Sequence, residues 1–307
     1  MTAIVTFDEG PGVGLGHRRR CEVVAGALRD RGWETVALAL DPASTRLVVD
    51  APVVVVDSYA FRADDRSHFR GGVVIALDDL CRDLDVAIVV DPAPGATRAP
   101  HRRAGQVLAG APYSLVDPHL RALGCRAAEA RPKTVLVATG AAYAAGVGAE
   151  IARAIRDEFE PGEVEPGEVE PGDGEVAVRL AVGPWGSRKV PDGVDVVERD
   201  DGLAIELAAA DVVVSAGGVT LLESLCLGRP TVAVALAPNQ RANVEGVVAE
   251  GAALLVDPGG AAAAVRRLVD DPALRVSISA AARRLIDGHG VDRVAEAIVA
   301  ATLRAAA

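Results

Sequence analysis

The sequence predicts an α/β protein built from two doubly wound domains, each around a parallel sheet. Short runs of β-branched residues alternate with longer stretches rich in Ala, Leu and Arg, which is the order of strands and helices in such a domain. Several runs, such as Val53–Val56, are apolar at every position, as strands are when both faces of a parallel sheet are covered. A chain of 307 residues is long enough for two such domains.

The first cycle of elements fills residues 1–130. A helix is expected at Gly16–Arg31, where Gly32 ends it. The expected strands are Ala3–Phe7, Glu34–Leu40, Pro52–Asp57, Val73–Leu77 and Val86–Asp91.

The second cycle begins after a polar stretch at 128–133, so the second domain is expected at 131–307. Its expected strands are Thr134–Ala138, Val176–Val182, Val194–Val197, Val212–Ser215, Thr231–Leu236 and Ala253–Val256. Its expected helices are Ala144–Phe159, Thr220–Leu227, Ala242–Glu250, Ala261–Val269, Pro272–Asp287 and Asp292–Ala306. The last helix is a candidate to cross back to the first domain.

The charge of the chain argues against a general nucleic-acid-binding role. There are 43 acids against 32 bases, a net charge of −11, whereas nucleic-acid binding usually needs a clustered basic face. Nine of the acids lie at 157–175, without a base, around a tandem Glu-Pro-Gly-Glu-Val-Glu repeat. Because Pro and Gly break regular structure and the acids repel one another, residues 160–175 are expected to form a disordered loop without a catalytic role. A calcium- or partner-binding role for the loop is the alternative.

No metal, cofactor or membrane span is predicted. The four cysteines show no C-x-x-C spacing, and the five histidines form no ligand cluster. The N-terminus has no signal-peptide pattern, and no uncharged apolar run approaches the ~20 residues of a spanning helix. These features favour a cytoplasmic protein, with peripheral membrane contact left open.

A first glycine cluster, Gly10–Gly16, separates the first strand from the first helix and is followed by His17. Glycines let the backbone approach a ligand, and the helix start offers free N–H groups. The helix dipole disfavours an imidazolium, so His17 is a candidate general base. A surface or capping histidine is the alternative. The glycines do not have the G-x-G-x-x-G spacing of a dinucleotide site.

A second glycine cluster follows the strand that ends at Ser215. Gly217, Gly218, Val219 and Thr220 can present N–H groups and one hydroxyl to a diphosphate, and Glu223, one turn later, can accept two ribose hydroxyls. A capping box between Thr220 and Glu223 explains the same Thr-x-x-Glu spacing. The double glycine after a buried strand favours the ligand-binding interpretation.

Two amides, Asn239 and Gln240, follow the next strand at the same sheet edge. There they can contact a ligand's hydroxyls or phosphate. An ordinary loop that caps the following helix is the alternative.

Together these segments resemble a known family. Gly14-Leu15-Gly16-His17, Val56-Asp57-Ser58-Tyr59, Asp78-Asp79, Ser215–Glu223 and Asn239-Gln240 occur in the order of the UDP-sugar hydrolases of pseudaminic acid biosynthesis, the PseG-like family. The C-terminal segments also resemble the peptidoglycan transferase that uses UDP-GlcNAc, a GT-B glycosyltransferase.

The resemblance implies a GT-B fold, in which two Rossmann-like domains face a cleft. It implies His17 as the base and Tyr59 as its partner, with Gly14, Gly16, Asp57 and Asp79 on the sugar side. Gly217–Thr220, Glu223, Asn239 and Gln240 would hold the nucleoside diphosphate, and no metal is implied.

Three functions remain open from the sequence. The first is hydrolysis of the anomeric C–O bond of a UDP-sugar, with His17 as general base. The alternative is a GT-B glycosyltransferase that moves the sugar from UDP or dTDP to a small-molecule or glycan acceptor, for which Arg98–Arg103 is a candidate acceptor groove or a solvated loop. The third is a non-catalytic nucleotide-sugar-binding protein.

Overall fold

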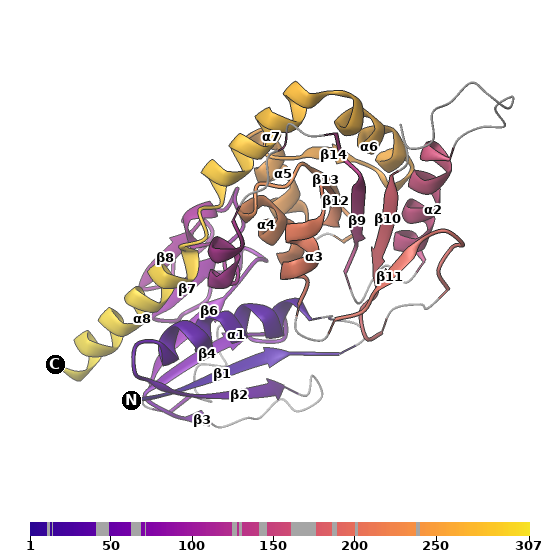
Figure 1. The fold of residues 1–307 in the computed structure, drawn as a ribbon. Coiled ribbons are helices and arrows are strands. Elements are labelled where there is room, and N and C mark those ends of the chain that lie inside the picture. Colours follow the sequence, from indigo (N-terminus) through magenta and orange to yellow (C-terminus); the bar gives the residue numbers. More distant parts are fainter. Residues whose placement is uncertain are drawn as a thin grey trace, which may run out of the picture. The chain divides into compact units, whose positions relative to one another are not determined.

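The structure of the chain is a computed structural model. It describes residues 1–10, 13, 15–40, 49–62, 69–70, 72–124, 128, 131–140, 146–160, 176–185, 189–199, 202–237 and 240–307. Two compact units are present, each with a six-stranded parallel sheet (Figure 1). The first comprises Met1–Ala122 and Leu285–Ala307, and the second Leu123–Arg284. The predicted α/β class is therefore confirmed.

The sheet of the first unit has the strand order β2-β1-β4-β6-β7-β8. Its strands are β1 (Thr2–Asp8), β2 (Glu34–Leu40), β4 (Val53–Asp57), β6 (Val73–Leu77), β7 (Ile88–Asp91) and β8 (Gln106–Ala109). A separate pair is formed by β3 (Val49–Asp50) and β5 (Phe69–Arg70). Because successive side chains of a strand point to opposite faces, each buried strand contributes to two apolar clusters.

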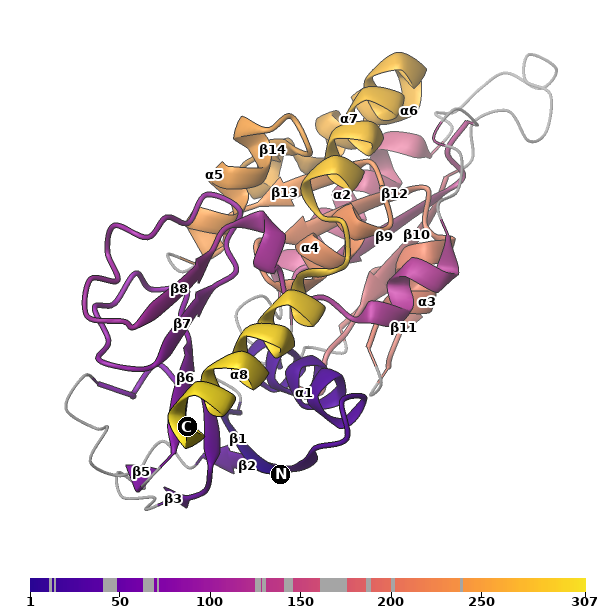
Figure 2. The same cartoon turned by 90° about the vertical axis from the view of Figure 1, so that its left-hand side faces the viewer.

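One face of this sheet packs against two helices, α1 (Gly16–Arg29) and α8 (Gly290–Ala306). Val53 and Val55 of β4 join a cluster that includes Leu28 of α1 and Val294 of α8. Figure 2 shows α8 running beside α1. The C-terminal helix therefore completes the core of the first unit.

The other face of the same sheet is covered by loops. Val56 of β4 packs in a second cluster with Phe61, Leu84, Val86 and other apolar residues. Phe61 follows β4, and Leu84 and Val86 lie between β6 and β7. The loops that leave the carboxyl ends of the strands are thus tied to the core.

The sheet of the second unit has the order β11-β10-β9-β12-β13-β14. Its strands are β9 (Thr134–Ala138), β10 (Ala177–Ala181), β11 (Asp195–Val197), β12 (Val212–Ala216), β13 (Thr231–Val234) and β14 (Leu254–Val256). Its helices are α2 (Val147–Phe159), α3 (Ala204–Ala209), α4 (Val219–Cys226), α5 (Arg241–Ala249), α6 (Ala261–Asp270) and α7 (Pro272–Leu285). Side chains of α2, α6 and α7 form its main core with β9, β12 and β13.

Three 3-10 helices complete the regular structure of the described residues: Ala111–Tyr113, Pro118–Leu123 and Pro258–Gly260. Among the described residues, no helix combines the length and apolarity needed to cross a membrane. Most of the acidic repeat, at 161–175, lies outside the described residues, so its predicted disorder stays a prediction.

Candidate active site

Three carboxylates follow neighbouring strands of the first unit. Asp8 and Asp57 are the last residues of β1 and β4, and Asp79 lies two residues beyond β6. Parallel pairing aligns β1 with β4 and β4 with β6, so all three acids lie at one edge of the sheet. In open α/β sheets the carboxyl ends of the strands are the edge where ligands bind.

His17 and Asp57 form a buried pair at this edge. His17 lies in the first turn of α1, and its Nδ1 is 2.5 Å from Oδ1 of Asp57, with the two side chains only 3% and 1% exposed. An ionised carboxylate can only accept, so Nδ1 carries the proton that is donated to Asp57. The neutral ring then holds its lone pair on Nε2, which is the tautomer of a general base. The sequence left open a surface or capping role for His17. In the structure, His17 is instead buried and paired with Asp57.

Arg20 keeps Asp57 ionised. It lies three residues after His17 on the same face of α1, and it donates from Nε to Oδ2 and from Nη2 to Oδ1 of Asp57, each at 2.9 Å. Burial alone would raise the pKa of Asp57, but the positive charge of Arg20 and the hydrogen bonds from Arg20 and His17 hold the pKa below its usual value. The role of Arg20 was not predicted from the sequence, although its i, i+3 spacing from His17 was a usable signal.

Arg20 also connects Asp79 to the pair. Its Nη1 donates to Oδ2 of Asp79 at 2.7 Å. The buried Oδ1 of Asp79 has no hydrogen-bond partner among the described residues, and the same holds for Oδ1 of Asp8. A buried acceptor without a donor is unfavourable, so both oxygens are suited to hydroxyl or amino groups of a ligand.

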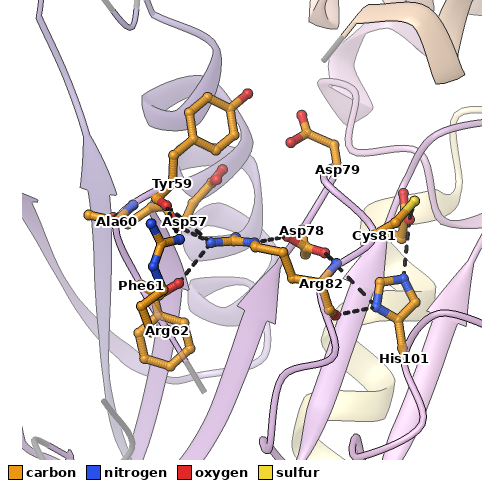
Figure 3. Close-up of polar contacts among 12 residues, drawn as sticks. Asp57, Tyr59, Ala60, Phe61, Arg62, Asp78, Asp79, Cys81, Arg82 and His101 are labelled. Atoms are coloured by element: carbon orange, nitrogen blue, oxygen red, sulfur yellow. Dashed lines mark hydrogen bonds and ion pairs between the residues drawn. The ribbon is translucent and has the colours of Figure 1, made fainter. Parts of the chain in front are cut away.

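Tyr59 packs its ring against His17. The two ring centroids are 4.3 Å apart and the planes meet at 84°, an edge-on contact. The backbone N–H of Tyr59 donates to Oδ2 of Asp8 at 2.8 Å. Figure 3 shows Tyr59 beside Asp57, with Asp79 on the neighbouring strand end. Of the other residues expected on the sugar side, Gly16 is the first residue of α1, and Gly14 lies outside the described residues.

The second unit presents a helix start without a side-chain cap. The N-cap residue of α4 is Gly218, which has no side chain to make a capping hydrogen bond. The capping box that Thr220 and Glu223 could form is therefore not present, because Thr220 lies inside the helix. The N–H groups of the first turn remain donors for an anion, and Val219 and Thr220 at this turn are partly exposed.

The two glycines of this turn differ in their surroundings. A Cβ on Gly217 would lie 2.6 Å from Cγ2 of Val244 and 2.7 Å from the carbonyl oxygen of Gln240, whereas one on Gly218 would meet no atom of the described residues within 4 Å. Gly217 therefore serves close packing, and Gly218 faces open space at the helix start.

Asn243 holds the turn in place and was missed from the sequence. Its Nδ2 donates to the carbonyl of Gly217 at 2.8 Å, and its buried Oδ1 has no partner within the described part of the chain. The signal available was an amide in the first turn of the helix that follows a buried strand.

Of the other residues predicted to contact the nucleotide, Glu223 and Gln240 belong to the described part of the chain. Glu223 lies in the middle of α4 and is partly buried. Gln240 uses its Oε1 to accept from the backbone N–H of Leu236 at 3.0 Å, and Asn239 lies outside the described residues. No group of His, Cys, Asp and Glu suited to a metal ion occurs among the described residues.

The Arg-rich stretch divides into exposed and buried parts. Arg102 and Arg103 are exposed and face Asp83 and Asp85, as expected for a solvated loop. His101 is wholly buried.

These two parallel sheets with flanking helices define the GT-B fold, as the sequence resemblance implied. The crystal structure of MurG from Acinetobacter baumannii is similar over 98% of this chain and all of that one, with a TM-score of 0.59 and 14% identity. The glycosyltransferase SsfS6 of Streptomyces sp. SF2575, complexed with thymidine diphosphate, is similar over 96% of this chain and 98% of that one, with a TM-score of 0.60 and 17% identity.

The sequence match to a curated protein covers a smaller part of the chain than the structural matches do. The spore coat polysaccharide biosynthesis protein SpsG of Bacillus subtilis is 30% identical over 105 residues, which are 32% of this chain and 31% of that protein. The match thus spans about a third of the curated relative. No protein-family model matches the chain. The comparisons support the GT-B fold and give no support to the narrower pseudaminic-acid hydrolase family.

Proposed function

We propose that this protein is a glycosyltransferase that moves a sugar from a nucleoside diphosphate to the hydroxyl or amine of an acceptor. The observation that carries the proposal is the buried His17–Asp57 pair in the first turn of α1. The sequence favoured hydrolysis of a nucleotide sugar and left sugar transfer as the alternative. The GT-B fold shared with MurG and SsfS6 supports transfer over hydrolysis.

In the proposed reaction His17 accepts the acceptor's proton, and Asp57 stabilises the positive charge that His17 then carries. Nε2 of His17 takes the proton from the acceptor as its oxygen or nitrogen bonds to the anomeric carbon. The bond between that carbon and the diphosphate oxygen breaks, and the leaving diphosphate keeps the electron pair. Asp57 stabilises the imidazolium that forms, as the carboxylate does in a His–Asp pair.

The diphosphate is assigned to the start of α4. Its first-turn N–H groups and the positive end of its dipole favour an anion, and the space around a Cβ at Gly218, free of atoms of the described residues, leaves room for one. UDP and dTDP both carry this diphosphate, so the proposal includes either nucleotide. SsfS6, whose structure contains thymidine diphosphate, makes dTDP one of the nucleotides to test.

Product analysis tests the proposal. A panel of UDP- and dTDP-sugars is incubated with the protein, with and without a mixture of sugar, polyketide and amine acceptors, and released nucleotide and glycosylated product are measured. Acceptor-dependent release together with a glycosylated product supports transfer. Release of free sugar without acceptor shows a hydrolase. Nucleotide binding without turnover on the whole panel shows a binding protein.

Alanine substitutions at the two adjacent glycines give a matched prediction for the nucleotide site. Gly218→Ala is expected to leave unfolding stability within about 0.5 kcal/mol but to weaken UDP or dTDP binding about tenfold or more, since the methyl occupies the ligand's space. Gly217→Ala is expected to lower stability by about 1–3 kcal/mol, because its methyl overlaps Val244 and Gln240.

Urea unfolding and titration calorimetry measure the two effects. The phosphate assignment fails if Gly218→Ala binds both nucleotides as tightly as the wild type.

A further inference from the structure

A second polar network lies at the carboxyl ends of β6 and β7, next to the proposed base. It comprises Asp78, Arg82 and His101, which Figure 3 labels, together with Asp91, the hydrogen-bond partner of His101. None of these side chains contacts His17 or Asp57 in the hydrogen bonds of the described residues. The network reaches the site through the segment Ser58–Phe61.

Asp78 binds both the backbone and the side chain of Arg82. Its Oδ1 accepts from Nε of Arg82 at 2.5 Å, and its Oδ2 accepts from the backbone N–H of the same residue at 2.7 Å. Asp78 is 1% exposed, so this ion pair is shielded from water and holds the guanidinium in one orientation.

The far end of Arg82 gathers three backbone carbonyls. Nη1 lies 3.1 Å from the oxygen of Ser58, 3.3 Å from that of Tyr59 and 2.8 Å from that of Phe61. These residues follow β4 without helix or strand pairing of their own. The guanidinium of Arg82 therefore supplies these carbonyls with the hydrogen-bond donors that backbone N–H groups would provide in a helix or sheet.

His101 anchors the backbone of Arg82. Its Nδ1 lies 2.9 Å from the carbonyl oxygen of Arg82, and its Nε2 lies 3.2 Å from Oδ2 of Asp91. A carbonyl only accepts, so Nδ1 carries a proton, and a second proton must lie between Nε2 and Asp91 for that contact to be favourable. Burial lowers the pKa of His101, but the hydrogen bonds to Asp91 and to the Arg82 carbonyl, with the negative charges of Asp91 and Asp78, raise the pKa overall.

Tyr59 is thus held at two backbone atoms. Its N–H is bound by Asp8 and its carbonyl lies within reach of Arg82, while exposed Arg62 also donates to that carbonyl at 3.1 Å. The direction of the Tyr59 ring, and hence its edge contact with His17, depends on this segment.

We propose that Arg82 is a positioning residue that holds the Ser58–Phe61 turn so that the Tyr59 ring stays packed against His17. The catalytic consequence rests on the proposed function of His17, whereas the positioning itself does not. Loss of Arg82 removes the guanidinium donor that the carbonyls of Ser58, Tyr59 and Phe61 share, so the turn shifts and the two rings separate.

The first experiment observes the His17 ring directly by NMR of the full chain with labelled histidine. Tyr59→Leu removes the aromatic ring and defines the shift of the His17 ring protons without its ring current. Arg82→Met is expected to move these resonances in the same direction as Tyr59→Leu. Arg102→Met, which changes an exposed arginine of a nearby loop, is expected to leave them unchanged.

The second experiment separates positioning from general loss of structure by kinetics. Arg82→Met is expected to lower kcat about 10- to 100-fold with little change in the KM for the nucleotide sugar. The same substitution in the Tyr59→Leu background is expected to have little further effect, because Arg82 acts through Tyr59. Arg82→Lys, which keeps a charged donor, is expected to restore part of the loss and replaces Arg82→Met if the latter does not fold.

The proposal is overturned if the folded Arg82 variants keep the wild-type His17 resonances, or if the kinetic effects of Arg82 and Tyr59 add fully. A shift of the His17 resonances in a protein that turns over no nucleotide sugar supports positioning and counts against the proposed transferase activity instead.

Discussion

Replacing His17 with glutamine is expected to lower kcat by about 10²- to 10⁴-fold, the usual contribution of a general base. Glutamine keeps a polar side chain of similar length and a donor for Asp57, but it has no nitrogen lone pair that takes up a proton near neutral pH. The base acts on the acceptor and not on the nucleotide, so the Kd for UDP or dTDP is expected to stay unchanged. Quenched product assays measure turnover, and calorimetry measures the Kd.

The matched control for this variant is His119→Gln. His119 is 91% exposed and pairs with Asp117 on the surface, so its replacement is expected to change neither kcat nor affinity. A His17→Gln protein with more than a tenth of wild-type kcat contradicts the assignment of His17 as the base. Loss of nucleotide affinity in that variant places His17 in binding rather than in proton transfer.

The fold could be predicted because buried parallel strands leave a strong signal in sequence. Val73–Leu77 and Thr134–Ala138 were predicted at the bounds that the structure has. Val73–Leu77 is apolar at every position and Thr134–Ala138 at every position after Thr134, so both faces of each strand carry the signal of a buried strand. The short helix α3, Ala204–Ala209, was not predicted, because six residues are too few to show a helical period.

Strand β8 was missed for a different reason. Gln106–Ala109 forms the edge of its sheet and is only partly buried, and its apolar run, Val107–Ala109, is short. His101 was placed in an Arg-rich loop on composition, although its side chain is fully buried. Its neighbours in sequence are charged, but its environment is set by Asp91 and Asp78 from other parts of the chain.

In the candidate site, too, the sequence predicts where each residue lies in its own element but not which residues contact one another. The sequence placed His17 at a helix start and Asp57 after a strand, and each position follows from local pattern. The contact between them depends on strand order, since β4 pairs directly with β1 and so brings Asp57 beside the helix that follows β1. Arg20 contacts both Asp57 and Asp79, a connection that no local motif encodes.

Asp57→Asn is expected to destabilise the protein by about 3–5 kcal/mol, the usual effect of removing one partner of a buried ion pair. Asp57 is 1% exposed and accepts two hydrogen bonds from Arg20 and one from His17. The NH₂ group of an asparagine would point at the N–H donors of Arg20 or His17, where a hydrogen bond cannot form. The buried guanidinium of Arg20 would then keep only one carboxylate partner, Asp79. Urea unfolding at pH 7 measures the difference, and Asp85→Asn, at an ion pair with both side chains over 40% exposed, is the control, expected to lose less than about 1 kcal/mol.

The pH dependence of this difference has a defined sign. The folded-state pKa of Asp57 lies below the value of about 3.9 expected in the unfolded chain, so its ionised form stabilises the fold above that pH. The contribution is lost as the pH falls through the folded-state pKa. The stability gap between wild type and Asp57→Asn is therefore expected to be larger at pH 7 than at about pH 3.5.

A double-mutant cycle separates the ion pair from other effects of the substitution. Arg20→Met alone leaves Asp57 and Asp79 without their shared cation, so it is also expected to destabilise strongly. Combining it with Asp57→Asn removes both unpaired charges of the pair, and the double variant is expected to lose less stability than the two single variants together. Full additivity of the two losses means that Arg20 and Asp57 do not stabilise one another. In that case Arg20 does not explain the ionised state on which the His17 tautomer depends.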